Sequence, residues 1–236
     1  MPALTIFPIE GVPEVRRGDV LAELLVSAAR AQETPLEDRD CVVVTQKIVS
    51  KAEGRVVPLD PSDPTARRAL VESESVRVLR RRGDLIISET AHGFVCANAG
   101  VDLSNVDDGQ AALLPVDPDR SARRIRDGIR AVAGVEVAVV VSDTFGRAWR
   151  MGLTDVAIGA SGLAAVVDLR GEHDAAGREL QVTEVALADE IAGAAELVKG
   201  KAAQLPAAVV RGLDPAWFRE GSARELVRPP GEDLFR

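Results

Sequence analysis

The sequence contains few residues of the kinds that build thiol- or imidazole-based sites. Its 236 residues include two cysteines, Cys41 and Cys96, and two histidines, His92 and His173. A structural zinc site takes four cysteine and histidine ligands at short spacings, so this inventory argues against one. Both cysteines lie in apolar runs, where we expect small core residues, and two isolated thiols indicate a reducing compartment.

Aromatic residues are also scarce, at 3% with no tyrosine. The 46% apolar content still allows a real core, which must be built from valine, leucine, isoleucine and alanine. At this length the chain can form one large domain or two small ones. The formal net charge of −8 argues against a general nucleic-acid binder, whose contact surface would be basic.

Long apolar runs and the common nucleotide-binding loops are absent too. No segment approaches 18 apolar residues and the N-terminus does not resemble a secretory signal, so we expect a cytoplasmic protein without a membrane span. There is no G-x-x-x-x-G-K-[ST] loop, no G-x-G-x-x-G after a strand and no nucleophile elbow. Metal-assisted phosphoryl transfer is the chemistry that these absences leave open.

Residues 135–155, VEVAVVVSDTFGRAWRMGLTD, join an apolar run to a polar group. The β-branched residues 135–141 predict a strand buried on both faces, followed by a loop at residues 142–144. An acid and a hydroxyl at Asp143 and Thr144, followed by glycine and arginine, suit a hard metal ion and a phosphate. An ordinary turn after the strand explains the same residues equally well.

A second group of oxygen ligands lies in residues 97–105, which include Asp102 and Asn105 after another apolar run. Two carboxylates and a threonine hydroxyl are ligands that Mg²⁺ or Mn²⁺ accepts while keeping waters and substrate phosphates. With this second group, a metal–phosphate site is favoured over two unrelated turns.

Lys47 and Lys51 lie four residues apart after the apolar run 41–44. A lysine at the end of a buried strand can act as a point charge on a phosphate. Taken alone, the local sequence favours solvated lysines.

Apolar periodicity and capping residues predict the remaining elements. The basic residues from Arg77 to Arg82 should form the solvated end of a helix, and His92 should lie exposed at a hairpin tip. We expect a polar loop at residues 171–178 and a polar C-terminal tail. The expected strands are residues 4–9, 41–44, 84–88, 93–97, 156–160, 164–169 and 207–210, and the expected helices are 20–31, 64–80, 121–132 and, capped by Thr183, 184–200.

Five motifs follow one another along the chain: GVPE at 11–14, VVVTQKIVSKAEGR at 42–55, NAGVDLSNV at 98–106, SDTFGRAWRMGLTDVAIG at 142–159 and ADEIAGAAELVKGK at 188–201. In this order they resemble those of the coenzyme F420-0 γ-glutamyl ligases. They look closest to the N-terminal ligase domain of the two-domain actinobacterial enzymes. The resemblance covers nearly the whole chain and implies a single ligase domain over residues 1–236, without the C-terminal reductase domain. It further implies an α+β fold of mixed sheets with flanking helices, an unusual ligase fold, and an intertwined homodimer.

The resemblance also implies a reaction. Enzymes of this family use GTP to join L-glutamate to the lactyl carboxylate of a deazaflavin precursor, coenzyme F420-0, and release GDP and phosphate. Further glutamates can follow through γ-linkages. The implied route passes through an acyl phosphate, with two divalent cations (Mg²⁺ or Mn²⁺) on the nucleotide phosphates and a K⁺ ion.

Carried residue by residue onto this sequence, the resemblance implies a role for several positions. Asp143 and Lys51 would be catalytic. Gln46 departs from the pattern, because close relatives have serine there. Arg147 and Arg150 match it without an assigned role, and our hypothesis is that they hold the phosphodiester or carboxylates of the deazaflavin. The divalent cations would bind Asp102, Asp143, Thr144 and Glu196, and GTP would contact Val12, Pro13, Glu14, Val15, Gln46, Lys51, Asn105, Ala194, Ala195, Glu196, Leu197, Val198, Lys199, Gly200 and Lys201.

Two other functions fit the same acidic residues. A metal-dependent phosphohydrolase would turn over GTP without any acceptor carboxylate. A nucleotide-sensing module would bind GTP without turnover, and would still bind it after Asp143→Asn.

Overall fold

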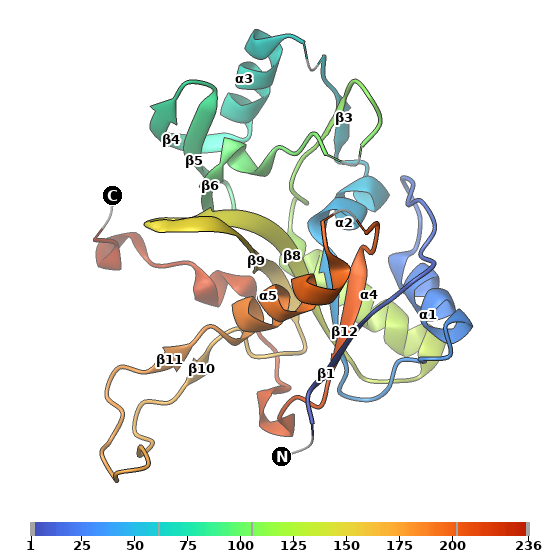
Figure 1. Cartoon of the computed structure of the whole chain (residues 1–236), viewed down its shortest axis with the longest axis vertical. Helices are drawn as coiled ribbons and strands as arrows, with labels where there is room; N and C mark the ends of the chain where they lie inside the picture. The colour runs from blue at the N-terminus through green and yellow to red at the C-terminus, as the bar shows by residue number, and fades with distance from the viewer. Residues whose placement is uncertain (1–2, 61, 105, 202, 235–236) are drawn as a thin grey trace.

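The computed structural model describes residues 3–60, 62–104, 106–201 and 203–234 (Figure 1). Its largest sheet has five strands in the order β1–β12–β2–β8–β9. The neighbours β2 and β8 are parallel, and the other pairs are antiparallel. These strands are β1 (Thr5–Pro8), β2 (Cys41–Thr45), β8 (Ala138–Arg147), β9 (Arg150–Ser161) and β12 (Ala207–Arg211).

Helices cover both faces of the five-stranded sheet (Figure 1). On one face, α1 and α4 share a core cluster with Val42 and Val139. On the other face, α5 packs in a second cluster with Val43 and Val140. Successive residues of β2 and β8 thus enter opposite layers, which is why these strands are unbroken apolar runs and why the strand predicted to be buried on both faces is confirmed. The helices are α1 (Leu21–Ala31), α2 (Gln46–Glu53), α3 (Pro64–Ser73), α4 (Pro118–Ala133) and α5 (Leu187–Lys199).

A smaller layer lies above this sheet in Figure 1. It has its own core cluster, which includes Leu59, Val71 and Ile86. The 3-10 turn Asn98–Gly100 follows directly after residues 95–97, the strand β6, and leads the chain to Asp102. This layer contains α3, the sheet of β4 (Ser75–Arg82), β5 (Leu85–Thr90) and β6 (Val95–Ala97), and the pair of β3 (Val56–Pro58) and β7 (Gln110–Ala112).

The central strand β8 continues well past Val141, so the expected loop at residues 142–144 was wrong. Asp143 pairs with Val156 and Thr144 with Asp155, so the polar residues continue the ladder with β9. The β8–β9 hairpin projects from the body of the protein (Figure 1), and at its tip Trp149 is 79% exposed and Met151 is 96% exposed.

The basic segment predicted to end a helix is a strand instead. α3 ends at Ser73, and Arg77 to Arg82 lie in β4, antiparallel to β5. Arg77 pairs across the strands with Glu89 at 2.9 Å, and Arg81 reaches Glu72 at 2.8 Å. The Arg77–Glu89 pair is a cross-strand pair of the kind that stabilises a sheet, and Glu72 reaches Arg81 from α3.

The region before α5 also differs from the prediction. Glu184–Val185 form a short strand, β11, paired with β10 (Val167–Asp168), so α5 begins at Leu187. Its N-cap is Ala186 without a side-chain hydrogen bond, and the expected cap at Thr183 was wrong. The expected strand at 164–169 is reduced to β10, and the expected strand at 156–160 is the end of β9.

Several other predictions are confirmed. α1, α4, β1, β2, β12 and the β5–β6 hairpin appear where the sequence predicts them, and Cys41 and Cys96 are buried free thiols. His92 is partly buried rather than exposed, with Nε2 2.9 Å from the carbonyl oxygen of Pro115. The fold is α+β, with mixed sheets and flanking helices. In the described part of the chain, no helix is both long and apolar enough to cross a membrane.

Candidate active site

A cleft of about 500 Å³ opens beside β8, at the point where the neighbouring strand β2 ends. Because these strands are parallel neighbours, Thr45 and Ser142 lie opposite each other, and the chain leaves the sheet after Thr45 while β8 continues past Ser142 in its pairing with β9. Residues from three other parts of the sequence complete the walls: 12–15; 102, 104, 106 and 107; and 196, 199–201 and 204–206.

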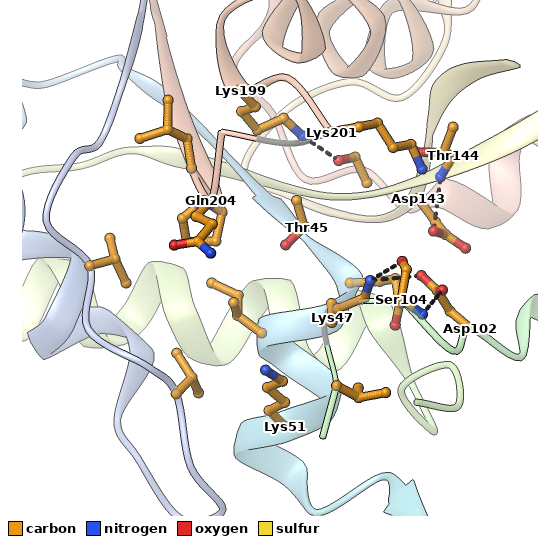
Figure 2. Close-up of a pocket in the computed structure, with 18 of the residues that line it drawn as sticks. Thr45, Lys47, Lys51, Asp102, Ser104, Asp143, Thr144, Lys199, Lys201 and Gln204 are labelled. Atoms are coloured by element: carbon orange, nitrogen blue, oxygen red, sulfur yellow. Dashed lines mark hydrogen bonds and ion pairs between the residues drawn. The ribbon is translucent and has the colours of Figure 1, made fainter. Parts of the chain in front are cut away.

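Two carboxylates from separate motifs, Asp102 and Asp143, lie near each other at one end of the cleft (Figure 2). Asp102 is fixed by a backbone bridge to Ala112, and its carboxylate lies 2.8 Å from Lys47 Nζ. The backbone amide of Ser104 donates to Asp102 Oδ1 at 2.7 Å. Asp143 Oδ1 accepts a hydrogen bond from its neighbour's backbone amide at 2.8 Å.

The charge around Asp143 favours a cation. Burial, together with the negative charges of Asp102 and Asp155, raises the pKa of Asp143 to about 7, against the lowering effect of a backbone amide and of Lys201. Burial also raises the pKa of Asp102, but Lys47 and the hydrogen bonds from Ser104 outweigh this effect and lower the pKa of Asp102 below its usual value. A carboxyl group surrounded by other carboxylates is stabilised as an anion when a cation arrives.

A largely buried network of side chains lines this end of the cleft. Asp155 is 3% exposed, and its Oδ1 accepts a hydrogen bond from the Thr144 hydroxyl at 2.6 Å. Its Oδ2 accepts from the Ser142 hydroxyl at 2.9 Å and lies 3.0 Å from Lys199 Nζ. Lys199 itself is 1% exposed, and its ammonium group also donates to Ser142 at 2.9 Å. Burial raises the pKa of Asp155, but Lys199 and these hydrogen bonds outweigh it and hold the pKa below its usual value.

Glu196 lies one helical turn before Lys199, at the end of α5. Its carboxylate is 3.7 Å from the Lys199 ammonium. Burial and the charge of Asp155 raise the pKa of Glu196, against the effect of Lys199 and Lys201. Glu196 is therefore a fourth acidic group of this region, beside Asp102, Asp143 and Asp155.

The opposite wall is formed by α2, which begins directly where β2 ends. Lys47 and Lys51 lie on this helix, one turn apart on the same face, rather than in a strand-end loop. Lys51 Nζ is 2.5 Å from Glu14 Oε1 on the N-terminal loop. Gln46 is 2% exposed, and its amide nitrogen has no hydrogen-bond partner among the described residues.

Comparison with known proteins decides the family. The sequence model of the F420-0:Gamma-glutamyl ligase family matches residues 11–212. The chain belongs to this family.

Similar ligases cover the same length. The chain is 44% identical over 249 residues to the coenzyme F420:L-glutamate ligase of Methanothermobacter thermautotrophicus, covering 99% of both sequences. It is 44% identical over 254 residues to the enzyme of the same name from Methanopyrus kandleri, covering 100% of this chain and 99% of the relative. With the Archaeoglobus fulgidus enzyme the identity is 41% over 247 residues, covering 98% and 96%.

Most positions to which the ligase resemblance assigns a role line this cleft. A few do not: along α5, Ala195 is buried in the core, Leu197 is 84% exposed, and Ala194 and Val198 lie outside the cleft lining. Asn105 lies outside the described residues. The positions in the lining are Val12, Pro13, Glu14, Val15, Gln46, Lys51, Asp102, Asp143, Thr144, Glu196, Lys199, Gly200 and Lys201.

The two arginines predicted to bind the deazaflavin are not in the cleft lining. Arg147 and Arg150 are exposed near the tip of the β8–β9 hairpin, where they face each other across the ladder. Arg147 donates a hydrogen bond to the carbonyl oxygen of Met151 at 3.1 Å.

The oxygen ligands of the cleft fit a hard divalent cation in their chemistry. They are carboxylates and a hydroxyl, and burial, with the nearby charges of Asp102 and Asp155, raises the pKa of Asp143. No three acidic, histidine or cysteine side chains in the described part of the chain are already grouped as a metal site. Lys47 and Lys199 pair with two of the carboxylates instead, at 2.8 and 3.0 Å.

The sequence-based assignment missed Asp155, although it stands in the same motif as Asp143. The missing information was the β8–β9 pairing, which sets Asp155 directly opposite Thr144. With the strand expected to end before residue 142, nothing connected the two residues. Symmetric pairing about the turn at residues 147–150 would set Leu153 opposite Thr144. The register shift between Gly146 and Arg147 brings Asp155 there instead, so residue spacing along the chain carried no signal.

Proposed function

We propose that this protein is a GTP-dependent ligase that joins L-glutamate to coenzyme F420-0 through an amide and then adds further γ-linked glutamates. The observation that carries the proposal is the convergence of Asp102, Asp143 and Lys51, from three separate motifs, on one cleft in a member of this family. Relatives that share 41–44% of its residues are named coenzyme F420:L-glutamate ligases, which supports the choice of acid and amino acid. The product places the enzyme in coenzyme F420 biosynthesis.

The cleft would hold the GTP. Lys51 and Lys201 bring positive charge to it, and a lysine is well suited to a phosphate as a point charge. Lys51 now pairs with the exposed side chain of Glu14, so a phosphate oxygen could replace this carboxylate at little cost. The short loop at residues 12–15 offers backbone groups to the nucleotide.

Two divalent cations, Mg²⁺ or Mn²⁺, together with K⁺, would neutralise the polyphosphate when bound. The residues to hold the divalent cations are Asp102, Asp143, Thr144 and Glu196, which all line the cleft. A cation between Asp102 and Lys47 would displace the lysine, leaving a second ammonium group free for phosphate.

The reaction that we propose runs through an acyl phosphate. A carboxylate oxygen of F420-0 attacks the γ-phosphorus of GTP, and GDP leaves with the electron pair of the broken bond. The amine of L-glutamate then attacks the activated carbonyl carbon, and inorganic phosphate and a proton leave. Lys51 would stabilise the charge that builds on the nucleotide, and the partly buried wall at Asp143 and Thr144 would limit attack by water.

Arg147 and Arg150 remain our candidates for the acidic groups of the deazaflavin. Both guanidinium groups are exposed, so neither is committed to the core. Arg147→Ala should raise the apparent KM for F420-0 by about tenfold while leaving that for GTP unchanged, because a charged hydrogen bond is worth about 1.5–3 kcal/mol. Equal effects on both substrates would remove this assignment.

We also propose that the enzyme works as a homodimer in the cytoplasm. The support for a dimer is the β8–β9 hairpin, whose tip exposes Trp149, Met151 and Leu153 by 65–96%. A group of large apolar side chains on a projecting hairpin is typical of a surface that another chain covers. The two buried free thiols suit a reducing compartment.

Mass spectrometry of F420-0 after incubation with the protein, GTP, Mn²⁺ and L-glutamate tests the proposed activity. Additions of glutamate-sized mass support it, and their number gives the length of the glutamate chain. GTP turnover that needs neither F420-0 nor glutamate would favour a phosphohydrolase. GTP binding without turnover, retained after Asp143→Asn, would favour a sensing module. Asp168→Asn, at an exposed carboxylate outside the cleft lining, is the control and should leave turnover unchanged.

A further inference from the structure

The Thr144 hydroxyl group is held in one orientation by a buried acceptor. Its oxygen lies 2.6 Å from Asp155 Oδ1, and Asp155 is 3% exposed. A carboxylate has no proton of its own to give, so the hydroxyl is the donor in this hydrogen bond. With its proton committed to Asp155, the Thr144 oxygen has its lone pairs available on the side away from Asp155, and Thr144 lines the cleft.

The two oxygens of Asp155 have different partners. Oδ2 accepts from Ser142 at 2.9 Å and pairs with Lys199 at 3.0 Å. Oδ1 accepts from Thr144. An ion pair that only tied α5 to the β8–β9 hairpin would be complete with Oδ2 and Lys199. The hydrogen bond at Oδ1 acts on the Thr144 hydroxyl.

We propose that Asp155 is a positioning residue: it accepts the Thr144 hydroxyl proton and so directs the lone pairs of the Thr144 oxygen toward a divalent cation in the cleft. The inference rests on the proposed function, which gives Thr144 a cation to bind. Lys199 keeps Oδ2 occupied, so Asp155 acts through Thr144 and does not itself bind the cation. Partners that orient a ligand from behind typically change cation affinity 10- to 100-fold when they are replaced.

Asp155→Asn tests this with little change of shape. To keep a bond to Lys199, the new amide must turn its oxygen to the Oδ2 position, which sets its NH₂ group against Thr144. The Thr144 oxygen then has to accept a hydrogen bond, and its own proton turns toward the cleft. We expect Mn²⁺ affinity, measured by electron paramagnetic resonance with GDP present, to fall at least about tenfold.

A double-mutant cycle separates positioning from a general structural effect. Thr144→Val removes the hydroxyl at nearly constant volume and should itself weaken Mn²⁺ binding. In the Thr144→Val protein, Asp155→Asn should cause no further loss, because the hydroxyl through which Asp155 acts is gone. In the Thr144→Ser protein, which keeps a hydroxyl, Asp155→Asn should again weaken binding about tenfold.

Asp189→Asn is the matched control. Asp189 is also an acid that tethers β9, accepting a hydrogen bond from the Ala157 amide at 2.8 Å, but it lies outside the cleft lining. Its replacement should leave Mn²⁺ affinity unchanged. Thermal unfolding of each variant shows whether the protein is folded before binding is measured.

The outcomes are distinguishable. If the wild type binds no Mn²⁺, both the proposed function and this inference fail. If the wild type binds Mn²⁺ but Thr144→Val binds it equally well, the inference alone is overturned, whether or not the Asp155 variants fold. Equal losses from Asp155→Asn with and without the Thr144 hydroxyl would likewise overturn it and leave Asp155 as a structural residue.

Discussion

Replacing Lys199 with methionine removes the ammonium group that pairs with Asp155. The two side chains are 1% and 2% exposed, so water cannot replace the lost partner. Breaking one half of a buried ion pair costs about 3–5 kcal/mol, because the remaining charge is left without compensation. For a protein of this size each kcal/mol lowers Tm by about 2–4 °C, so we expect Lys199→Met to lower Tm by roughly 6–20 °C.

The pH dependence of this loss follows from the two pKa values of Asp155. In the wild type its pKa is lowered in the folded state, so the group contributes stability above the unfolded pKa and loses it as the pH falls through the folded value. In the Lys199→Met protein, Asp155 is still buried but has no ammonium partner, so the pKa of Asp155 in the folded state should rise above its value in the unfolded state. Protonation of Asp155 should therefore stabilise the variant. The difference in the free energy of unfolding between wild type and Lys199→Met should therefore have its full size at pH 7.5 and shrink toward about pH 4.

Urea denaturation followed by circular dichroism at pH 7.5 and pH 4.5 measures both parts of this prediction. Lys201→Met is the control, because Lys201 is exposed and should contribute less than about 1 kcal/mol. The reasoning would be refuted if Lys199→Met lowered the free energy of unfolding by less than about 1 kcal/mol at pH 7.5. A difference between wild type and variant that is larger at pH 4.5 than at pH 7.5 would also refute it.

Three further predictions test other parts of the site and fold. The affinity for Mn²⁺ should rise from about pH 6 to pH 8, because Asp143, with a pKa raised to about 7, must lose its proton before it can bind a cation; a flat profile in calorimetric titrations would contradict this. Lys51→Ala should weaken GTP binding about 10- to 100-fold and leave the KM for F420-0 unchanged, and an unchanged Kd for GTP in fluorescence titrations would exclude a phosphate contact. Gly159→Ala should lower the free energy of unfolding by at least about 2 kcal/mol, because the new Cβ would overlap with the carbonyl oxygen of Pro118. Gly231→Ala, with open space around the new methyl group, is its control in the same denaturation assay. Equal stability of the two variants would contradict the prediction, because it would show that α4 can move to accommodate the methyl group at Gly159.

The central strands and the position of the cleft were predictable from the sequence. The β-branched runs of β2 and β8 indicated strands buried on both faces, and the structure has helices on both sides of them. Polar residues that followed these runs suggested ligand groups at strand ends. Because β2 and β8 are parallel neighbours, Gln46 and Asp143 do arrive at the same edge.

The pairings across strands were not predictable in the same way. Residues 75–82 carry an arginine-rich pattern that suits the end of a helix, and only pairing with β5 provides Glu89 opposite Arg77. The role of Asp155 depends on a hairpin whose strand continues through polar residues. In both cases the structure depends on a partner strand, and the local periodicity of the sequence does not show which strand that is.

The number of GDP molecules released for each glutamate added to F420-0 tests the central claim most directly. If the cleft holds nucleotide and acceptor together, GDP release should require F420-0 and L-glutamate and should match amide formation one for one. The Asp143→Asn protein should lose both activities together, since both depend on the same site. GDP release at an unchanged rate without the acceptor, or amide formation that survives Asp143→Asn, would contradict the account.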